Sequence, residues 1–335
     1  MGTSMASFMS RGLAALLVLA TCLACSDDGD TEPEAPGDTT AVTQGTGSID
    51  GTGGTSSDSG GSNATDSGGT SSDSSGSNDT ATTSPAGGSG GGGGSAGTCK
   101  RGIAANVAPG QAFSRGVSWW NNWAIQADGA GDGIEFVPMI WGRSTAGDAI
   151  PESSRFLLGF NEPNFFAQAN LSPEQAAEAW PEVEASAQAR EVPIVSPALN
   201  YCGPADQCHD TDPYQYLRDF FAACGDCKVD YVAVHWYNCD LPSLRDYLEP
   251  GGNLEGFEQF GKPIWLTEFS CDPSASVEEQ EAYMREAIPY LDENQNVFRY
   301  SWFSAGPIPN AKLINDDGSP TALGEVYIDL PQDCD

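Results

Sequence analysis

Short apolar and β-branched runs recur along the last two thirds of the chain, and amphipathic stretches separate several of them. Such short runs are typical of buried strands, whereas apolar residues spaced three or four apart predict helices. The clearest helices are predicted at residues 172–190 and 276–294. Strands are predicted at residues 101–105, 116–120, 135–141, 156–160, 193–198, 231–237, 263–267 and 297–303.

The alternation of strands and helices predicts an α/β fold with a parallel sheet, and eight strands predict a closed (β/α)8 TIM barrel. The first three strands follow one another too closely in sequence for full helices to lie between them. We therefore expect a compact barrel in which some helices are missing near the start. In such barrels the active site lies at the carboxyl ends of the strands.

Residues 1–25 have the pattern of a secretory signal peptide. One basic residue, Arg11, precedes an apolar run at residues 12–20 that is too short to span a membrane. Cys25, followed by Ser26-Asp27-Asp28, resembles a bacterial lipoprotein cleavage site, and Cys22 is the alternative lipidated residue. The sequence predicts a secreted or cell-surface protein whose membrane contact is a lipid anchor, with plain secretion as the alternative.

Residues 26–97 consist mainly of Gly, Ser, Thr and Asp, with a six-residue repeat at 53–58 and 68–73. This composition buries too little apolar surface to offset the entropy of ordering, so a disordered linker is predicted. No bidentate acid follows the Asp-rich repeats, which argues against calcium loops. Residues 98–335 are then a single folded domain.

The chain is strongly acidic, with a formal net charge of −33. From Cys99 onward, 13 Lys and Arg stand against 36 Asp and Glu, a net charge near −23. This charge excludes nucleic acid and other polyanions as partners and favours a neutral substrate. Solubility of an exported protein explains the charge equally well. We expect a monomer.

The folded domain contains eight cysteines, an even number that predicts disulfides in an exported chain. A zinc site at Cys224 and Cys227 is disfavoured, because no second pair of this spacing accompanies it and the chain has only two histidines. Neither a metal nor another cofactor is expected. The predicted bridges are Cys99–Cys334, Cys202–Cys208, Cys224–Cys227 and Cys239–Cys271.

Two carboxylate motifs carry the candidate chemistry. Residues 159–164 read Gly-Phe-Asn-Glu-Pro-Asn, and residues 265–269 read Trp-Leu-Thr-Glu-Phe. Glu162 follows the fourth predicted strand and Glu268 follows the seventh, so both side chains are expected at the mouth of the barrel. Two carboxyl groups at one site suggest glycoside hydrolysis, in which one protonates the leaving oxygen and the other supports the charge on the sugar.

The chain resembles glycoside hydrolase family 128 over nearly all of residues 99–327. The resemblance is carried by the two glutamate motifs, by the His-Trp-Tyr sequence at 235–237, and by segments 100–104 and 136–142. It implies a (β/α)8 endo-β-1,3-glucanase that retains anomeric configuration. Carried over by motif, Glu162 is the general acid/base, Glu268 the nucleophile, Asn161 a ligand of the sugar 2-hydroxyl and Tyr237 a hydrogen-bond donor to the nucleophile.

Tryptophans cluster near the predicted strand ends, where flat rings stack on sugars, although about half of them are expected in the core. Trp302 at the end of strand eight resembles the platform beneath the reacting sugar in related barrels. His235 either orients a catalytic group or is a core histidine. The tryptophans considered are Trp119, Trp120, Trp123, Trp141, Trp236 and Trp302, of which Trp119, Trp141, Trp236 and Trp302 are the predicted sugar-binding residues.

Two other functions remain open on the sequence. One is a barrel hydrolase of another neutral polysaccharide, such as a β-mannan or a β-1,4-glucan, because motifs do not reveal subsite contacts. The other is a noncatalytic glycan-binding surface lipoprotein. The presence of both glutamates argues against the second. Exo action is an alternative to endo action.

Overall fold

The computed structural model describes residues 99–127, 129, 131, 133–251 and 255–332. The predicted signal peptide at 1–25, the predicted linker at 26–97 and Cys334 of the predicted Cys99–Cys334 bridge lie outside these ranges. No helix in the described ranges is long and apolar enough to cross a membrane.

The strands of the domain form one parallel barrel, as predicted. They pair in the order β3-β2-β1-β8-β7-β6-β5-β4. The ring closes because Met139, just after β3, bridges Leu158 of β4, with Ile140 N donating to Leu158 O at 2.9 Å. The strands are β1 Arg101–Ala104, β2 Trp119–Asn121, β3 Glu135–Phe136, β4 Leu157–Leu158, β5 Ile194–Leu199, β6 Tyr231–Tyr237, β7 Ile264–Ser270 and β8 Val297–Phe303.

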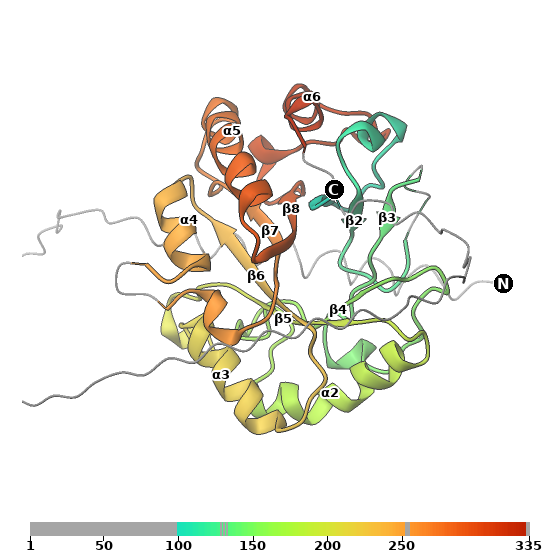
Figure 1. The fold of residues 1–335 in the computed structure, drawn as a ribbon, viewed down its shortest axis with the longest axis vertical. Coiled ribbons are helices and arrows are strands. Elements are labelled where there is room, and N and C mark those ends of the chain that lie inside the picture. The colour runs from blue at the N-terminus through green and yellow to red at the C-terminus, as the bar shows by residue number, and fades with distance from the viewer. Residues whose placement is uncertain (1–98, 128, 130, 132, 252–254, 333–335) are drawn as a thin grey trace, which may run out of the picture. The chain divides into compact units, whose positions relative to one another are not determined.

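The α-helices cover the outside of the later strands (Figure 1). Between β1 and β2, and between β3 and β4, the described residues form only short 3-10 helices, Gln111–Arg115 and Arg143–Thr145. The expectation of missing helices near the start is thus confirmed. The helices are α2 Pro173–Gln188, α3 Pro213–Cys224, α4 Leu241–Leu248, α5 Val277–Glu293 and α6 Ala322–Asp329.

The two predicted long helices begin where their capping residues place them. Ser172 and Ser276 each accept a hydrogen bond from the backbone N–H three residues later, and the side chains of Gln175 and Glu279 return the contact. These reciprocal bonds satisfy amide groups that have no partner within the helix. The caps set the residue at which α2 begins after β4 and the residue at which α5 begins after β7. β4 and β7 are the two strands that lead to the glutamates.

The core has two main parts and a small third cluster of Phe165, Cys202 and Cys208. One fills the barrel interior, with Trp119 and Trp265 at its centre and their ring centroids 5.0 Å apart. The guanidinium of Arg299 lies among these rings and donates to Glu135 Oε2 at 2.7 Å. The other part joins the outer face of the strands to the helices. Strand side chains therefore alternate between the interior and the helices, which decides what each motif residue faces.

Three of the predicted disulfides are present: Cys202–Cys208, Cys224–Cys227 and Cys239–Cys271. The Cys224–Cys227 pair is thus a disulfide rather than half of a zinc site. Cys239 follows β6 and Cys271 follows β7. This bridge ties together the carboxyl ends of the two strands that carry His235 and Glu268.

Candidate active site

Glu162 is held at the mouth of the barrel by a tight approach of the backbone. A Cβ at Gly159 would lie 2.8 Å from both Val195 O and the Trp180 ring, so only glycine allows the segment to pack against β5 and α2. Glu162 then adopts a left-handed conformation, with φ 39°, and its N–H donates to Ala198 O at 2.9 Å. Such strain in a non-glycine residue is typical of functional sites.

Glu268 faces the same region because of a β-bulge. Leu266 pairs with Val234, but the next pair is Glu268 with His235, so Thr267 is the additional residue in β7. Side chains alternate along a strand, and without the bulge Glu268 would face away from the side that Trp265 occupies. The irregularity turns the carboxylate toward His235, as bulges often do at active sites.

His235 connects the two glutamates. Its Nδ1 lies 2.9 Å from Glu162 Oε1, and its Nε2 lies 3.4 Å from Glu268 Oε1. A ring nitrogen of His235 and one oxygen of each carboxylate all lie within 4.8 Å of one another. All three side chains are buried. The sequence motifs after β4, in β6 and in β7 therefore meet in one group, here named the carboxylate–histidine cluster.

Two further donors contact Glu268. The Tyr237 hydroxyl donates to Oε2, as the family resemblance implied, and the Trp123 indole N–H donates to Oε1 at 2.6 Å. Burial raises the pKa of Glu268, and the charge of Glu162 raises it further. His235 and the bonds from Tyr237 and Trp123 oppose this rise, since each favours the ionised carboxylate.

The two carboxylate neighbours of His235 raise its pKa. Burial disfavours the imidazolium, but the charges of Glu268 and Glu162 and the hydrogen bond to Glu162 outweigh burial, so the pKa of His235 is raised. The three side chains have the donor types of a metal site. However, both oxygens of Glu268 already accept hydrogen bonds and Nδ1 of His235 already contacts Glu162. The geometry therefore favours two carboxylates held by hydrogen bonds from neighbouring side chains over a metal site.

Asn161 and Trp141 lie beside the cluster. The Asn161 N–H donates to Trp141 O at 2.9 Å, and its side-chain Oδ1 is buried without a partner among the described residues. Trp141 is partly exposed. Asn200, which the motifs did not identify, donates from Nδ2 to Glu162 Oε1 at 3.4 Å. Its signal in the sequence was a polar residue directly after a buried strand.

Three of the predicted sugar-binding tryptophans lie in the core. Trp119 has no exposed surface and packs on Trp265 inside the barrel. Trp236 faces outward and packs on Tyr247 of α4, with ring centroids 5.1 Å apart. Trp302 also faces outward, buried against Phe269 and α5. These side chains have little or no surface for a sugar, so the expectation of stacking is wrong for this conformation.

Phe303 takes the inward position that the sequence suggested for Trp302. Its ring packs against Trp123 and Tyr237, with centroid distances of 5.6 and 5.4 Å. The difference is one residue, and one residue changes the face of a strand. His235, for which the sequence left open an orienting role or a core position, has no exposed surface and lies between the glutamates.

Two large apolar side chains are exposed in loops at the Glu162 side of the site. Tyr201 is 42% exposed and follows Asn200, which contacts Glu162; Phe166 is 45% exposed and lies four residues after Glu162. Tyr201 packs on the rings of Tyr214 and Tyr247, with centroids 6.2 and 5.3 Å away. Its ring is thus a fixed, half-exposed surface of the kind that stacks on sugars.

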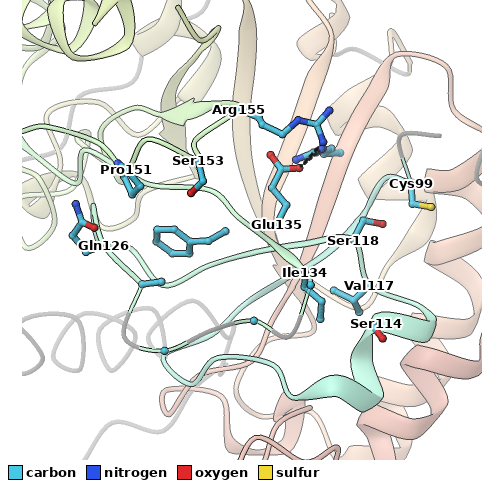
Figure 2. A pocket seen from close by; sticks show the side chains of 16 residues that line it. Cys99, Ser114, Val117, Ser118, Gln126, Ile134, Glu135, Pro151, Ser153 and Arg155 are labelled. Carbon is cyan, nitrogen blue, oxygen red and sulfur yellow. Dashed lines mark hydrogen bonds and ion pairs between the residues drawn. The ribbon is translucent and has the colours of Figure 1, made fainter. Parts of the chain in front are cut away.

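A hollow of about 760 Å³ lies away from this site (Figure 2). Cys99, Ser118 and Glu135 line it, and they lie at or before the amino ends of β1, β2 and β3. Arg155 and Glu135 point toward one another there, with Nη1 and Oε2 3.8 Å apart. The glutamates lie at the carboxyl ends of the strands, so this hollow is not the active site.

The chain is similar to glycoside hydrolases. The family described as "Glycosyl hydrolase catalytic core" matches residues 102–327. A crystal structure of a family 128 subgroup II endo-β-1,3-glucanase from Sorangium cellulosum has 40% identity and a TM-score of 0.62, covering 70% of this chain and 99% of that one.

Two more distant relatives extend the similarity. A subgroup I endo-β-1,3-glucanase variant from Amycolatopsis mediterranei, crystallised with laminarihexaose, has 30% identity and a TM-score of 0.56, covering 69% of this chain and 98% of that one. Alkali-sensitive linkage protein 1 of Schizosaccharomyces pombe is 33% identical over 251 residues. The match covers 68% of this chain but only 44% of the yeast protein, so the chain spans about half the length of that curated relative.

Proposed function

Since this chain belongs to glycoside hydrolase family 128, we propose that it is an endo-acting β-1,3-glucanase that retains anomeric configuration. The observation that carries the proposal is the meeting of Glu162 and Glu268 at the carboxyl ends of β4 and β7. Two of the relatives with solved structures are named endo-β-1,3-glucanases, and one of these two was crystallised with laminarihexaose. A neutral glucan also suits an enzyme with a net charge of −33.

The proposed reaction proceeds by double displacement. In the first step an oxygen of the Glu268 carboxylate attacks the anomeric carbon, the glycosidic C–O bond breaks, and the proton of Glu162 moves to the leaving oxygen. In the second step Glu162 takes a proton from water, and the water oxygen replaces Glu268 at the anomeric carbon. Each step inverts the configuration, so the product has the β configuration of the substrate.

The spacing of the carboxylates supports retention. One oxygen of Glu162 and one of Glu268 lie within 4.8 Å of each other. Retaining enzymes place the carboxyl groups about 5–5.5 Å apart, whereas inverting enzymes need about 6.5–9.5 Å to admit a water molecule. An upper limit of 4.8 Å between two carboxylate oxygens is compatible with the shorter, retaining separation and so supports direct attack by Glu268.

The hydrogen bonds around the pair support the assignment of roles. Tyr237 and Trp123 both donate to Glu268, which favours its ionised form as a nucleophile requires. The described side-chain contacts of the Glu162 carboxylate come from Asn200 and from His235. His235 passes between the carboxylates and fixes the orientation of each, so its part is to position the reacting groups.

The substrate contacts follow from what is exposed near the pair. Asn161, with its free Oδ1 in the described structure, is the proposed ligand of the sugar 2-hydroxyl. Trp141 is the proposed stacking residue beside it. On the other side of Glu162, Tyr201 and Phe166 offer exposed rings where the leaving part of the glucan would lie. Contacts on both sides of the scissile bond suit endo action.

We also propose that the enzyme is a monomer displayed at the cell surface. Residues 1–25 act as a lipoprotein-type signal, with lipid on Cys25 or Cys22, and residues 26–97 separate residues 98–335 from the membrane. Acyl labelling of single Cys25→Ser and Cys22→Ser variants tests the anchor. Labelling that survives both substitutions contradicts lipidation at these cysteines.

A reducing-end assay over a panel of polysaccharides tests the activity. We expect turnover of laminarin and curdlan, no turnover of β-1,4-glucan or β-mannan, and early release of laminari-oligosaccharides of several lengths. Release of one small sugar alone from the start would contradict endo action. Glu268→Ala and Glu162→Ala are the matched controls, since each removes one reacting group. Turnover of a mannan instead would contradict the proposed substrate.

A further inference from the structure

Trp123 has an unusual backbone for a bulky residue. It lies two residues beyond β2 in a left-handed conformation, with φ 60°. Side chains of this size rarely adopt such angles, which cost of order 1–3 kcal/mol and persist where the surroundings enforce them. Here the conformation brings the indole N–H to 2.6 Å from Glu268 Oε1. The strain is thus associated with a contact to the nucleophile.

The two neutral donors to Glu268 share one support. The Phe303 ring packs edge-to-face on Trp123, with an interplanar angle of 62°, and on Tyr237, with an angle of 84°. Trp123 donates to one carboxylate oxygen and Tyr237 to the other. Segments after β2, in β6 and at the end of β8 therefore fix both oxygens of one carboxylate, which prevents its rotation.

The choice of donors has a chemical reason. Within the described ranges, His235 is the only basic side chain at ion-pair distance from Glu268, at 3.4 Å. An indole N–H donates but accepts nothing and keeps its proton at any working pH. It therefore stabilises the carboxylate more than the protonated acid. A neutral donor also loses less than a cation when the glycosyl ester forms and the charge on Glu268 disappears.

We propose that Trp123 is a positioning residue of the hydrolytic reaction, whose indole N–H holds Oε1 of the nucleophile Glu268 in its attacking orientation. The inference rests on the proposed glycosidase function and assigns Trp123 a role beyond packing or sugar stacking. It explains why a tryptophan occupies a strained turn. It also explains why the ring is not fully buried in either core cluster.

The test replaces Trp123 by phenylalanine, and in a second variant by 3-benzothienylalanine, which keeps the shape of indole and lacks the N–H. A lost hydrogen bond to a charged group predicts a fall in kcat/KM of roughly ten- to hundredfold, mostly in kcat, in both variants. The acidic limb of the pH profile of kcat/KM should move to higher pH by about one unit or more. Trp120→Phe is the matched control.

Trp120 lies on β2 three residues away and faces Phe136, with ring centroids 5.0 Å apart, so its replacement should leave the pH profile in place. A wild-type kcat/KM and acidic limb in both Trp123 variants would overturn the inference. So would a rise in KM alone, which would make Trp123 a sugar-stacking residue. Failure of the wild-type enzyme to hydrolyse any β-1,3-glucan would instead contradict the proposed function, which keeps the two failures distinct.

Discussion

Replacement of Trp302 by phenylalanine should destabilise the protein without weakening glucan binding. The indole is fully buried, donates from Nε1 to Ala311 O at 2.9 Å and packs on Phe269 at a centroid distance of 5.1 Å. The substitution leaves the Ala311 carbonyl unsatisfied, which costs about 1–3 kcal/mol, and the lost ring volume adds roughly 1 kcal/mol. For a domain of this size the total corresponds to a fall in Tm of about 5–15 °C.

Thermal unfolding followed by near-UV circular dichroism measures the fall, and initial rates on laminarin at 25 °C give KM. Trp141→Phe is the contrasting variant. Because Trp141 is partly exposed beside Asn161, this substitution should raise KM with only a small change in Tm. If Trp302→Phe raised KM severalfold and left Tm unchanged, the ring would face the sugar and the inferred orientation of β8 would be refuted.

Three other predictions concern the reacting groups and their frame. Tyr237→Phe removes a donor to the ionised carboxylate, so the pKa of Glu268 should rise and the acidic limb of the pH profile of kcat/KM should move to higher pH. The rate should fall by about ten- to hundredfold. An acidic limb that does not move would contradict the contact between Tyr237 and Glu268. Glu162→Ala should hydrolyse aryl glucosides far better than laminarin, and azide should partly restore turnover with a β-glycosyl azide as product; an α-azide would contradict double displacement. Reduction of Cys239–Cys271, which are 32 residues apart, should cost about 3–4 kcal/mol of stability in a denaturant titration, and no change would show that the bridge is dispensable.

The barrel and the two glutamates could be predicted from the sequence because both depend on local patterns. Apolar runs, Ser-capped helices and turn residues are local, and the carboxyl end of a parallel strand places Glu162 without further information. The position of Glu268 depended on the strand end as well. The β-bulge at Thr267 that turns it inward has no signature in the sequence. Only the resemblance of the motif to the family indicated that Glu268 faces the site.

The stacking residues could not be predicted because they depend on the face of each strand. Trp302 and Phe303 are adjacent and both aromatic, and only the register with β7 shows that Phe303 faces the site. Trp123 lies in the Trp-Trp-Asn-Asn-Trp segment at residues 119–123, where the cluster of tryptophans suggested rings that stack on sugars. Its contact with Glu268 follows from a left-handed turn that propensity disfavours.

Capture of the glycosyl-enzyme tests the central claim most directly. A 2-deoxy-2-fluoro laminaribiosyl fluoride should react with the enzyme, because fluorine at C2 slows both displacements and the good leaving group spares only the first. Intact-protein mass spectrometry should show one added glycosyl group, and peptide analysis should place it on Glu268. A label on Glu162, or no label together with an α-anomer as the first product from laminarin, would contradict the account.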